Sequence, residues 1–68
     1  MYLKRLKDLR EDHDYTQTYI AKYLNMKQQQ YSRYETGEFE ISLENLIKLA
    51  KLYNVSVDYL LNLKDSKK

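Results

Sequence analysis

Apolar residues recur along the chain at helical spacing. Leu3, Leu6 and Leu9 follow one another at intervals of three, which predicts an amphipathic helix over about residues 2–12. Most other positions of this segment are charged with mixed sign, as is typical of a helix face in water. We therefore expect a solvated outer face made of Lys4, Arg5, Lys7, Asp8, Glu11 and Asp12.

Two short helices joined by a tight turn are predicted over residues 16–37. Thr16 can cap the first helix, because its hydroxyl can accept a free backbone N–H of the opening turn. Asn25 should end that helix, since Asn tolerates the left-handed backbone conformation. Gly37 should end the second helix, which would begin at about Lys27. The predicted apolar faces are Ile20, Ala21 and Leu24 in the first helix, and Tyr31 and Tyr34 in the second.

The second half of the chain predicts two further helices. Ser42 can cap a helix that runs to Asn54, and Ser56 can cap a short one over residues 57–62. Apolar residues cover more than one stripe of the longer helix, which is therefore expected to be the most buried of the five. They are Leu43, Leu46, Ile47, Leu49, Ala50, Leu52 and Tyr53. The pattern, with one Gly and no Pro, predicts an all-α domain.

Composition narrows the class of protein. The 68 residues suffice for one domain, predicted over residues 1–63, followed by a basic, disordered tail at 64–68. Without Cys and with one His, disulfides and Cys or His zinc sites are excluded as stabilising links. No apolar run is long enough for a membrane span, and we expect a cytoplasmic protein. No catalytic constellation, metal site or cofactor site is predicted, so an enzyme is not expected.

Charge is distributed unevenly, although the net charge is only +2. Residues 15–34 contain the cations Lys22, Lys27 and Arg33 and no acid, whereas residues 36–47 contain three acids and no base. This distribution predicts a local positive surface on the helix pair.

The outward side of the helix over 27–36 carries side chains that can hydrogen-bond base edges. Gln28 and Gln29 can each pair with the N6 and N7 edge of adenine, and Arg33 suits the O6 and N7 acceptors of guanine. Each such contact should contribute about 1–3 kcal/mol of discrimination between bases. The predicted base-reading residues are Lys27, Gln28, Gln29, Ser32 and Arg33.

A set of residues at characteristic positions runs through the two central helices. It consists of Gln17, Ala21, the turn at Asn25, the polar run after position 26, Glu35 and Gly37. This spacing resembles that of the Cro/CI-type, or XRE-family, helix-turn-helix DNA-binding domains of phage-repressor-like proteins. The match extends from about Leu6 to Asn62, including ISLENLIKLAKLYNVSVDYLLN. The resemblance implies a compact five-helix lambda-repressor-like fold, with the helix-turn-helix formed by the second and third helices.

The resemblance also implies roles for residues outside the reading face. Arg10 resembles one partner of an ion pair whose acid is Glu35, which would tie the first helix to the third. Pairing of two copies is implied near the fifth helix, where the candidates are Val57, Tyr59 and Leu63. Thr16 and Gln17, at the start of the second helix, and Thr36, at the end of the third, would contact DNA phosphates.

Two positions depart from the family pattern. Lys27 stands where the family usually has Ser or Thr as a helix cap, and a nearby phosphate or guanine would turn its unfavourable charge into an attraction. The alternative is a Lys that is simply exposed. The loop after Gly37 is acidic, with Glu38 and Glu40 where the family commonly has basic residues, so phosphate contacts from this loop are not expected.

The predicted function is sequence-specific binding of double-stranded DNA by a transcriptional regulator, expected to be a repressor, with the third helix in the major groove. A homodimer on a palindromic operator, with half-sites about 34 Å apart, would compensate for the few cations of one domain. The alternative is an antitoxin-like or other protein-interaction module, with or without DNA binding. Tyr19 and Tyr23 would be its contact surface, unless they simply pack as an i, i+4 pair.

Overall fold

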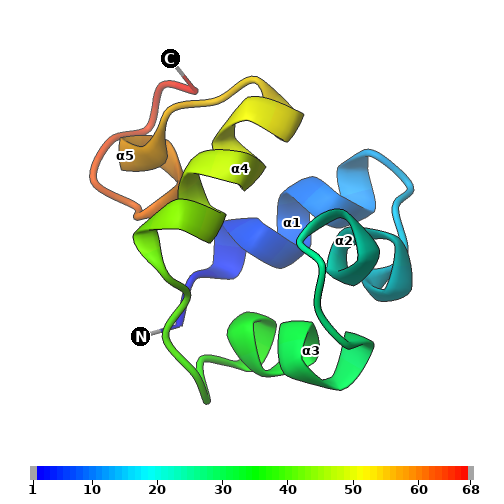
Figure 1. The fold of residues 1–68 in the computed structure, drawn as a ribbon. Helices are drawn as coiled ribbons and strands as arrows, with labels where there is room; N and C mark the ends of the chain where they lie inside the picture. Colours follow the sequence, from blue (N-terminus) through cyan, green and yellow to red (C-terminus); the bar gives the residue numbers. More distant parts are fainter. Residues whose placement is uncertain (1, 68) are drawn as a thin grey trace.

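The computed structural model describes residues 2–67, whose regular structure is entirely helical. Five helices follow in order: α1 (Lys4–Asp12), α2 (Gln17–Tyr23), α3 (Gln28–Thr36), α4 (Leu43–Tyr53) and α5 (Val57–Leu60). In Figure 1, α2 and α3 form the right-hand and lower part of the molecule, α4 and α5 form the left-hand part, and α1 runs between them. The predicted all-α, five-helix fold is confirmed.

One apolar core holds the helices together. The leucine stripe predicted for α1 is buried, and Leu6 is fully inaccessible to solvent. Burying a side chain of this size contributes about 1.5–3 kcal/mol, so the stripe is a main reason that α1 can serve as the central helix. The buried apolar residues are Leu3, Leu6, Leu9, Ile20, Ala21, Leu24, Tyr31, Leu46, Leu49, Ala50, Tyr53 and Leu60.

Hydroxyl side chains cap three helices at their amino ends, as predicted. Thr16, Ser42 and Ser56 each accept the backbone N–H of the residue three positions later, at 3.0, 3.2 and 3.0 Å. Each cap satisfies one of the backbone donors that a helix leaves free in its first turn. The starts of α2, α4 and α5 are therefore determined by local sequence.

Left-handed residues follow the carboxyl ends of the longer helices. Asn54 has φ 57° and Gly37 has φ 82°, so both end their helices as predicted. Asn25 has φ 59°, but α2 already ends at Tyr23. A Cβ at position 37 would also lie 3.0 Å from the Cα of Tyr2, so close packing adds to the conformational reason for glycine.

Helix α4 has four buried residues, more than any other of the five helices, as expected. Its buried residues follow one face, whereas Leu43 is 64% exposed and Ile47 is 40% exposed. These two residues lie one turn apart and point away from the core. The helix has more apolar residues than its single contact with the core can bury.

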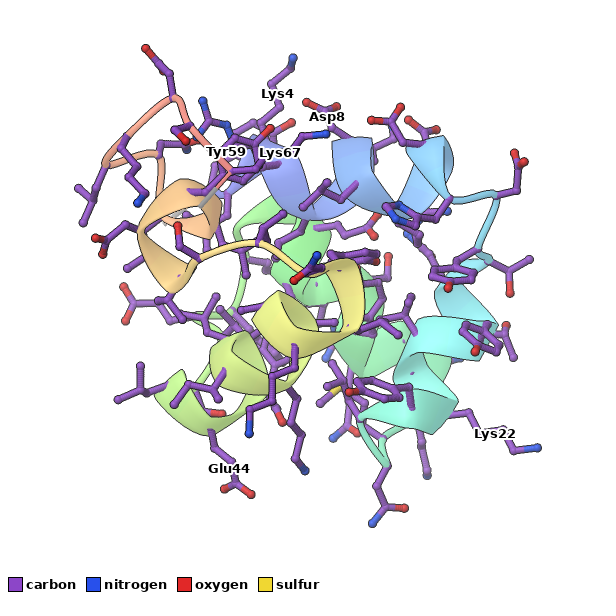
Figure 2. The ribbon with its side chains drawn as sticks, turned by 90° about the horizontal axis from the view of Figure 1, so that it is seen from above. Lys4, Asp8, Lys22, Glu44, Tyr59 and Lys67 are labelled. Carbon is purple, nitrogen blue, oxygen red and sulfur yellow. The ribbon has the colours of Figure 1, made fainter. Side chains whose placement is uncertain are left out.

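Arg5 does not belong to the solvated outer face predicted for α1. Its Nη1 donates to the backbone oxygens of Tyr59 at 2.8 Å and Lys64 at 2.7 Å, and its guanidinium carbon lies 4.0 Å from the centroid of the Tyr59 ring. Other charged residues of α1 do face solvent, such as Lys4 and Asp8, which pair at 3.3 Å (Figure 2). Arg5 instead joins α1 to the chain after α5.

Residues 64–67 contact the domain at two places. Arg5 lies 3.3 Å from a carboxylate oxygen of Asp65, and the backbone oxygen of Lys67 accepts the N–H of Ser56 at 2.7 Å. The division into a domain of residues 1–63 and a disordered tail stays a prediction, and positions 1 and 68 lie outside the described residues.

Within residues 2–67, no helix has the length and apolar character needed to cross a membrane. The same residues contain no group of three or more His, Asp or Glu side chains placed to hold a metal ion.

Candidate nucleic-acid interface

Helix α3 has two chemically different faces. Tyr31 and Glu35 are buried on its inner side, which fixes the helix against the rest of the domain. Its outer side is polar and open, with Gln28, Gln29 and Arg33 exposed. A shallow depression on this side is lined by Gln28, Gln29, Ser32, Arg33, Thr36 and Glu38. The structure therefore brings most of the predicted base-reading residues together on one surface, which we call the α3 face.

Lys27 precedes α3 at its N-cap position and is exposed. A lysine side chain has no acceptor, so it cannot cap the helix. The Gln30 side chain reaches back instead and accepts the backbone N–H of Lys27 at 3.2 Å. The ammonium group thus stands at the positive end of the helix dipole, where an unpaired cation is unfavourable by about 0.3–1 kcal/mol.

Arg10 and Glu35 lie in contact across the core side of α3. Arg10 donates from Nε to Oε2 of Glu35 at 2.7 Å and from Nη2 to Oε1 at 3.1 Å. Its Nη1 also donates to the backbone oxygen of Tyr15 at 3.0 Å. The two parallel hydrogen bonds fix both distance and orientation, and so join α1 to the last turn of α3.

The environment of Glu35 keeps it ionised. Burial alone would raise the pKa of this carboxyl group, but hydrogen bonding by Arg10, Tyr31 and Gln17 and the charge of Arg10 outweigh burial, so the pKa lies below its ordinary value. The pKa of Arg10 is raised, mainly by its hydrogen bond to Glu35. Both groups are therefore charged at neutral pH.

A chain of hydrogen bonds links this ion pair to the α3 face. Gln17 donates from Nε2 to Oε1 of Glu35 at 3.0 Å, and Gln28 donates from Nε2 to Oε1 of Gln17 at 2.6 Å. Both ends of the Gln17 amide are thus used within the protein. This link could not be recognised along the chain, where Gln17 was expected to contact a phosphate, because it depends on how α2 crosses α3.

Two tyrosine hydroxyls are buried beside the core, those of Tyr31 and Tyr53. Burial is the main reason that the pKa of each phenol is raised. Both rings therefore stay neutral and add no negative charge behind the α3 face.

The hydroxyls of Thr16 and Thr36, both exposed, already take part in local hydrogen bonds. Thr16 caps α2, and the Thr36 hydroxyl donates to the backbone oxygen of Arg33 at 3.2 Å and accepts the N–H of Glu38 at 3.4 Å. Each oxygen lies at the edge of the helix-turn-helix unit. A hydroxyl can make more than one hydrogen bond, so these contacts leave capacity for a ligand.

Arg33 contacts the acidic loop that follows α3. Its Nε lies 3.2 Å from Oε2 of Glu38, and its guanidinium carbon lies 5.1 Å from the centroid of the Phe39 ring. From the sequence, Glu38 was expected only to repel phosphate. Its pairing with Arg33 depends on the turn at Gly37, which brings the loop back along α3.

Tyr19 and Tyr23 are 49% and 42% exposed on α2. Each of the two tyrosines also has a partner on another segment. The Tyr19 ring stacks on Tyr15 with centroids 4.7 Å apart, and the Tyr23 hydroxyl donates to the backbone oxygen of Lys48 at 3.1 Å. These contacts follow from the positions of the preceding loop and of α4.

The candidate dimer residues differ in accessibility. Leu63 is 71% exposed, whereas Val57 is half-buried against the core. The ring of Tyr59 is covered on one face by Arg5. Leu63 is therefore the most available of the three for a second copy.

Charged residues of both signs project from the surface. Lys22 points from α2 into solvent at the lower right of Figure 2, and Glu44 points away from the start of α4 at its lower left. Lys27 and Arg33 bracket the α3 face. The helix-turn-helix unit carries three of the twelve Lys and Arg residues of the chain, and residues 15–34 contain no acid.

Comparison with known proteins agrees with this architecture. A family model described as "Helix-turn-helix" matches residues 6–60. The chain is 40% identical over 65 residues to the uncharacterized HTH-type transcriptional regulator YobD of Bacillus subtilis (strain 168), a match that covers 96% of this chain and 58% of YobD. It is 45% identical over 58 residues to the HTH-type transcriptional regulator ImmR of the same organism, covering 85% of this chain and 46% of ImmR.

A solved structure gives the same result. The crystal structure of a transcriptional regulator from Listeria innocua superposes with a TM-score of 0.82 at 30% identity, covering 88% of this chain and 56% of that one. The chain spans about half the length of the relatives that it matches. Family match, relatives and fold agree with the resemblance seen in the sequence, and the chain belongs to the Cro/CI-type, or XRE, helix-turn-helix family.

Proposed function

We propose that this domain binds double-stranded DNA at a specific sequence, with α3 in the major groove, as part of a transcriptional repressor. The observation that carries the proposal is the α3 face: exposed Gln28, Gln29 and Arg33 project from a helix whose other side is buried. The major groove is wide enough for one helix and presents a different pattern of donors and acceptors for each base pair. Family membership places the chain among DNA-binding transcriptional regulators, which are not enzymes.

The side chains of the α3 face suit particular bases. Gln28 and Gln29 can each form two hydrogen bonds with adenine, and Arg33 can do so with guanine. The hydrogen bond from Gln28 to Gln17 limits the rotamers of Gln28 before DNA arrives. Less side-chain entropy is then lost on binding.

Contacts with the phosphate backbone would set the register of α3. Thr16 and Thr36 lie at the two edges of the helix-turn-helix unit, and Lys27 adds a cation at the start of α3. Gln17 donates one of its two amide hydrogens to Glu35 and accepts from Gln28, so its second hydrogen stays for a phosphate while it holds Gln28. Such contacts add affinity without distinguishing sequences.

Tight binding in this proposal requires two copies of the domain. The few cations of one domain favour a homodimer on a palindromic operator, because counterion release increases with the number of phosphates contacted. Val57, Tyr59 and Leu63 remain the proposed contact, with Leu63 the most exposed. We place the protein in the cytoplasm, since a regulator must reach the DNA that it controls.

The proposal can be tested by selecting bound duplexes from a random pool. We expect one preferred sequence, with an affinity that falls as salt rises. The variant Gln28→Ala with Gln29→Ala should lose this preference and keep its weaker binding to scrambled DNA. Equal binding of selected and scrambled duplexes by the unaltered protein would exclude recognition by α3.

A protein-interaction module is the second candidate function, because Tyr19 and Tyr23 are both exposed on α2. Exposed tyrosines are common among residues that dominate protein interfaces. The variant Tyr19→Ala with Tyr23→Ala separates the two functions: it should leave selection of DNA intact if α3 carries the function. Loss of regulation in the tyrosine variant, with the glutamine variant active, would favour the interaction module.

A further inference from the structure

The loop after α3 holds the side chain of Arg33 at two points. Glu38 contacts Nε at 3.2 Å, and the Phe39 ring lies 5.1 Å from the guanidinium carbon. The loop is itself fastened to the end of α3, because the N–H of Phe39 donates to the backbone oxygen of Arg33 at 3.1 Å and that of Glu38 donates to the hydroxyl of Thr36. The Glu38 carboxylate and the Phe39 ring therefore both lie beside the helical turn that carries Arg33.

These contacts use only part of the guanidinium group. Arginine can pair with guanine through its two terminal amino groups, which lie in one plane with Nε. Glu38 occupies the Nε side and Phe39 lies against the plane. A guanine would then pair with the terminal amino groups of Arg33 through its O6 and N7 acceptors.

A stabilising role does not explain the pair. The side chains of Arg33 and Glu38 are 50% and 61% exposed, and an exposed ion pair contributes little to folding. The placement on the α3 face is more informative, since Glu38 lines the same depression as Gln28, Gln29 and Ser32. Glu40, two residues along, lines a different depression with Leu3, Ile41, Leu46 and Leu61.

We propose that Glu38 is a positioning residue that orients Arg33 for guanine and keeps it away from phosphates. An unrestrained arginine has a large side-chain entropy and can satisfy its charge at any phosphate. A carboxylate at Nε reduces that freedom, and its charge disfavours approach of the DNA backbone at this position. The acidic loop would then lower affinity for DNA in general and raise discrimination. This inference rests on the proposed function of α3.

The test compares Glu38→Gln with Glu40→Gln, which removes the same charge from the same loop. Affinities are measured over a range of salt for the selected duplex and for a scrambled one. For Glu38→Gln we expect stronger binding to the scrambled duplex and a selected-to-scrambled ratio that falls by about tenfold, the scale of one base contact. Glu40→Gln should leave that ratio unchanged. Equal ratios in the two variants would overturn the inference.

A second measurement needs no DNA. Nuclear magnetic resonance can follow exchange of the Arg33 Nε proton with water, and we expect faster exchange in Glu38→Gln than in the unaltered protein or in Glu40→Gln. Unchanged exchange would overturn the positioning role. In an Arg33→Ala background, Glu38→Gln should no longer alter the ratio, and a persisting effect would show that Glu38 acts through another residue.

The two proposals fail in different ways. If the unaltered protein shows no preferred duplex, the proposed function fails and this inference fails with it. If it shows a preferred duplex that depends on Gln28 and Gln29, and Glu38→Gln behaves as Glu40→Gln, only the inference about Glu38 fails.

Discussion

Single side chains connect the interior of this domain to its surface. Glu35 is buried and accepts hydrogen bonds from Arg10 and Gln17, and Gln17 in turn accepts one from Gln28 on the α3 face. A buried charge is costly unless it is paired. Arg10 and Gln17 both bond the Glu35 carboxylate, and Gln17 also orients Gln28, a proposed base contact.

Removing one partner of the ion pair should destabilise the fold strongly. Arg10→Met leaves the Glu35 carboxylate buried without its cation, which costs about 3–5 kcal/mol in comparable cases. Urea denaturation followed by circular dichroism measures the loss. Lys7→Met, at an exposed position of the same helix, serves as the control and should change stability little. A similar loss of stability in both variants would show that the ion pair does not stabilise the fold more than an exposed lysine does.

The ion pair should also make stability depend on pH. The pKa of Glu35 is lower in the folded state than its ordinary value of 4.5, so its contribution is present above pH 4.5 and is lost as pH falls through the lowered pKa. We expect the thermal midpoint to fall in acid less steeply in Glu35→Gln than in the unaltered protein. Glu44→Gln, which alters an exposed carboxylate, should keep the original slope.

At the level of the helices, local chemistry sets the start of α2, α4 and α5, whereas α1 and α3 begin without a hydroxyl cap. Three helices begin with a Ser or Thr cap, whereas α3 begins at Lys27 without one. The helix that carries the proposed contacts is thus less stable at its start than it could be. A cation at this end disfavours the free helix and favours an anion beside it.

Exchanging this lysine for a cap should separate stability from binding. Lys27→Ser gains a hydroxyl acceptor and loses the unfavourable charge, which should raise the free energy of unfolding by about 0.5–2 kcal/mol. If Lys27 contacts a phosphate, the salt dependence of duplex binding should become shallower by about 0.9 in slope. Lys51→Ser, on exposed α4 surface, is the control for charge. An unchanged slope would leave Lys27 as a merely exposed residue.

At the scale of the whole molecule, some large apolar side chains lie outside the core and are exposed to solvent. Leu43 and Leu63 are 64% and 71% exposed, the first at the start of α4 and the second beyond α5. Single exposed apolar side chains are common on protein surfaces, so exposure alone does not identify an interface and the position of each residue must be considered. Only Leu63 lies in the segment where family resemblance implies pairing of two copies.

Replacing Leu63 should weaken pairing and leave single-domain binding intact. For Leu63→Gln we expect lower affinity for a duplex with two half-sites about 34 Å apart, and unchanged affinity for one half-site. Leu43→Gln, an equivalent change on α4, should alter neither. Sedimentation of the bound complexes gives the number of copies. If both variants bind the double site normally, the dimer contact lies elsewhere.

The amino-acid sequence by itself determined the helices and the surface that α3 presents. Periodic leucines, the caps at Thr16, Ser42 and Ser56, and the stop at Gly37 act over a few residues, so they can be recognised along the chain. The polar run from Lys27 to Arg33 likewise indicated its chemistry before any fold was known.

Only the tertiary structure decided how these parts meet. The hydrogen bond between Gln17 and Gln28, the pairing of Arg33 with Glu38 and the contact of Arg5 with the chain after α5 all depend on how helices and loops cross in space. Leu43 is exposed for the same reason, because an apolar side chain is buried only where another element covers it. Local periodicity specifies helices, whereas long-range packing selects the partners of each side chain.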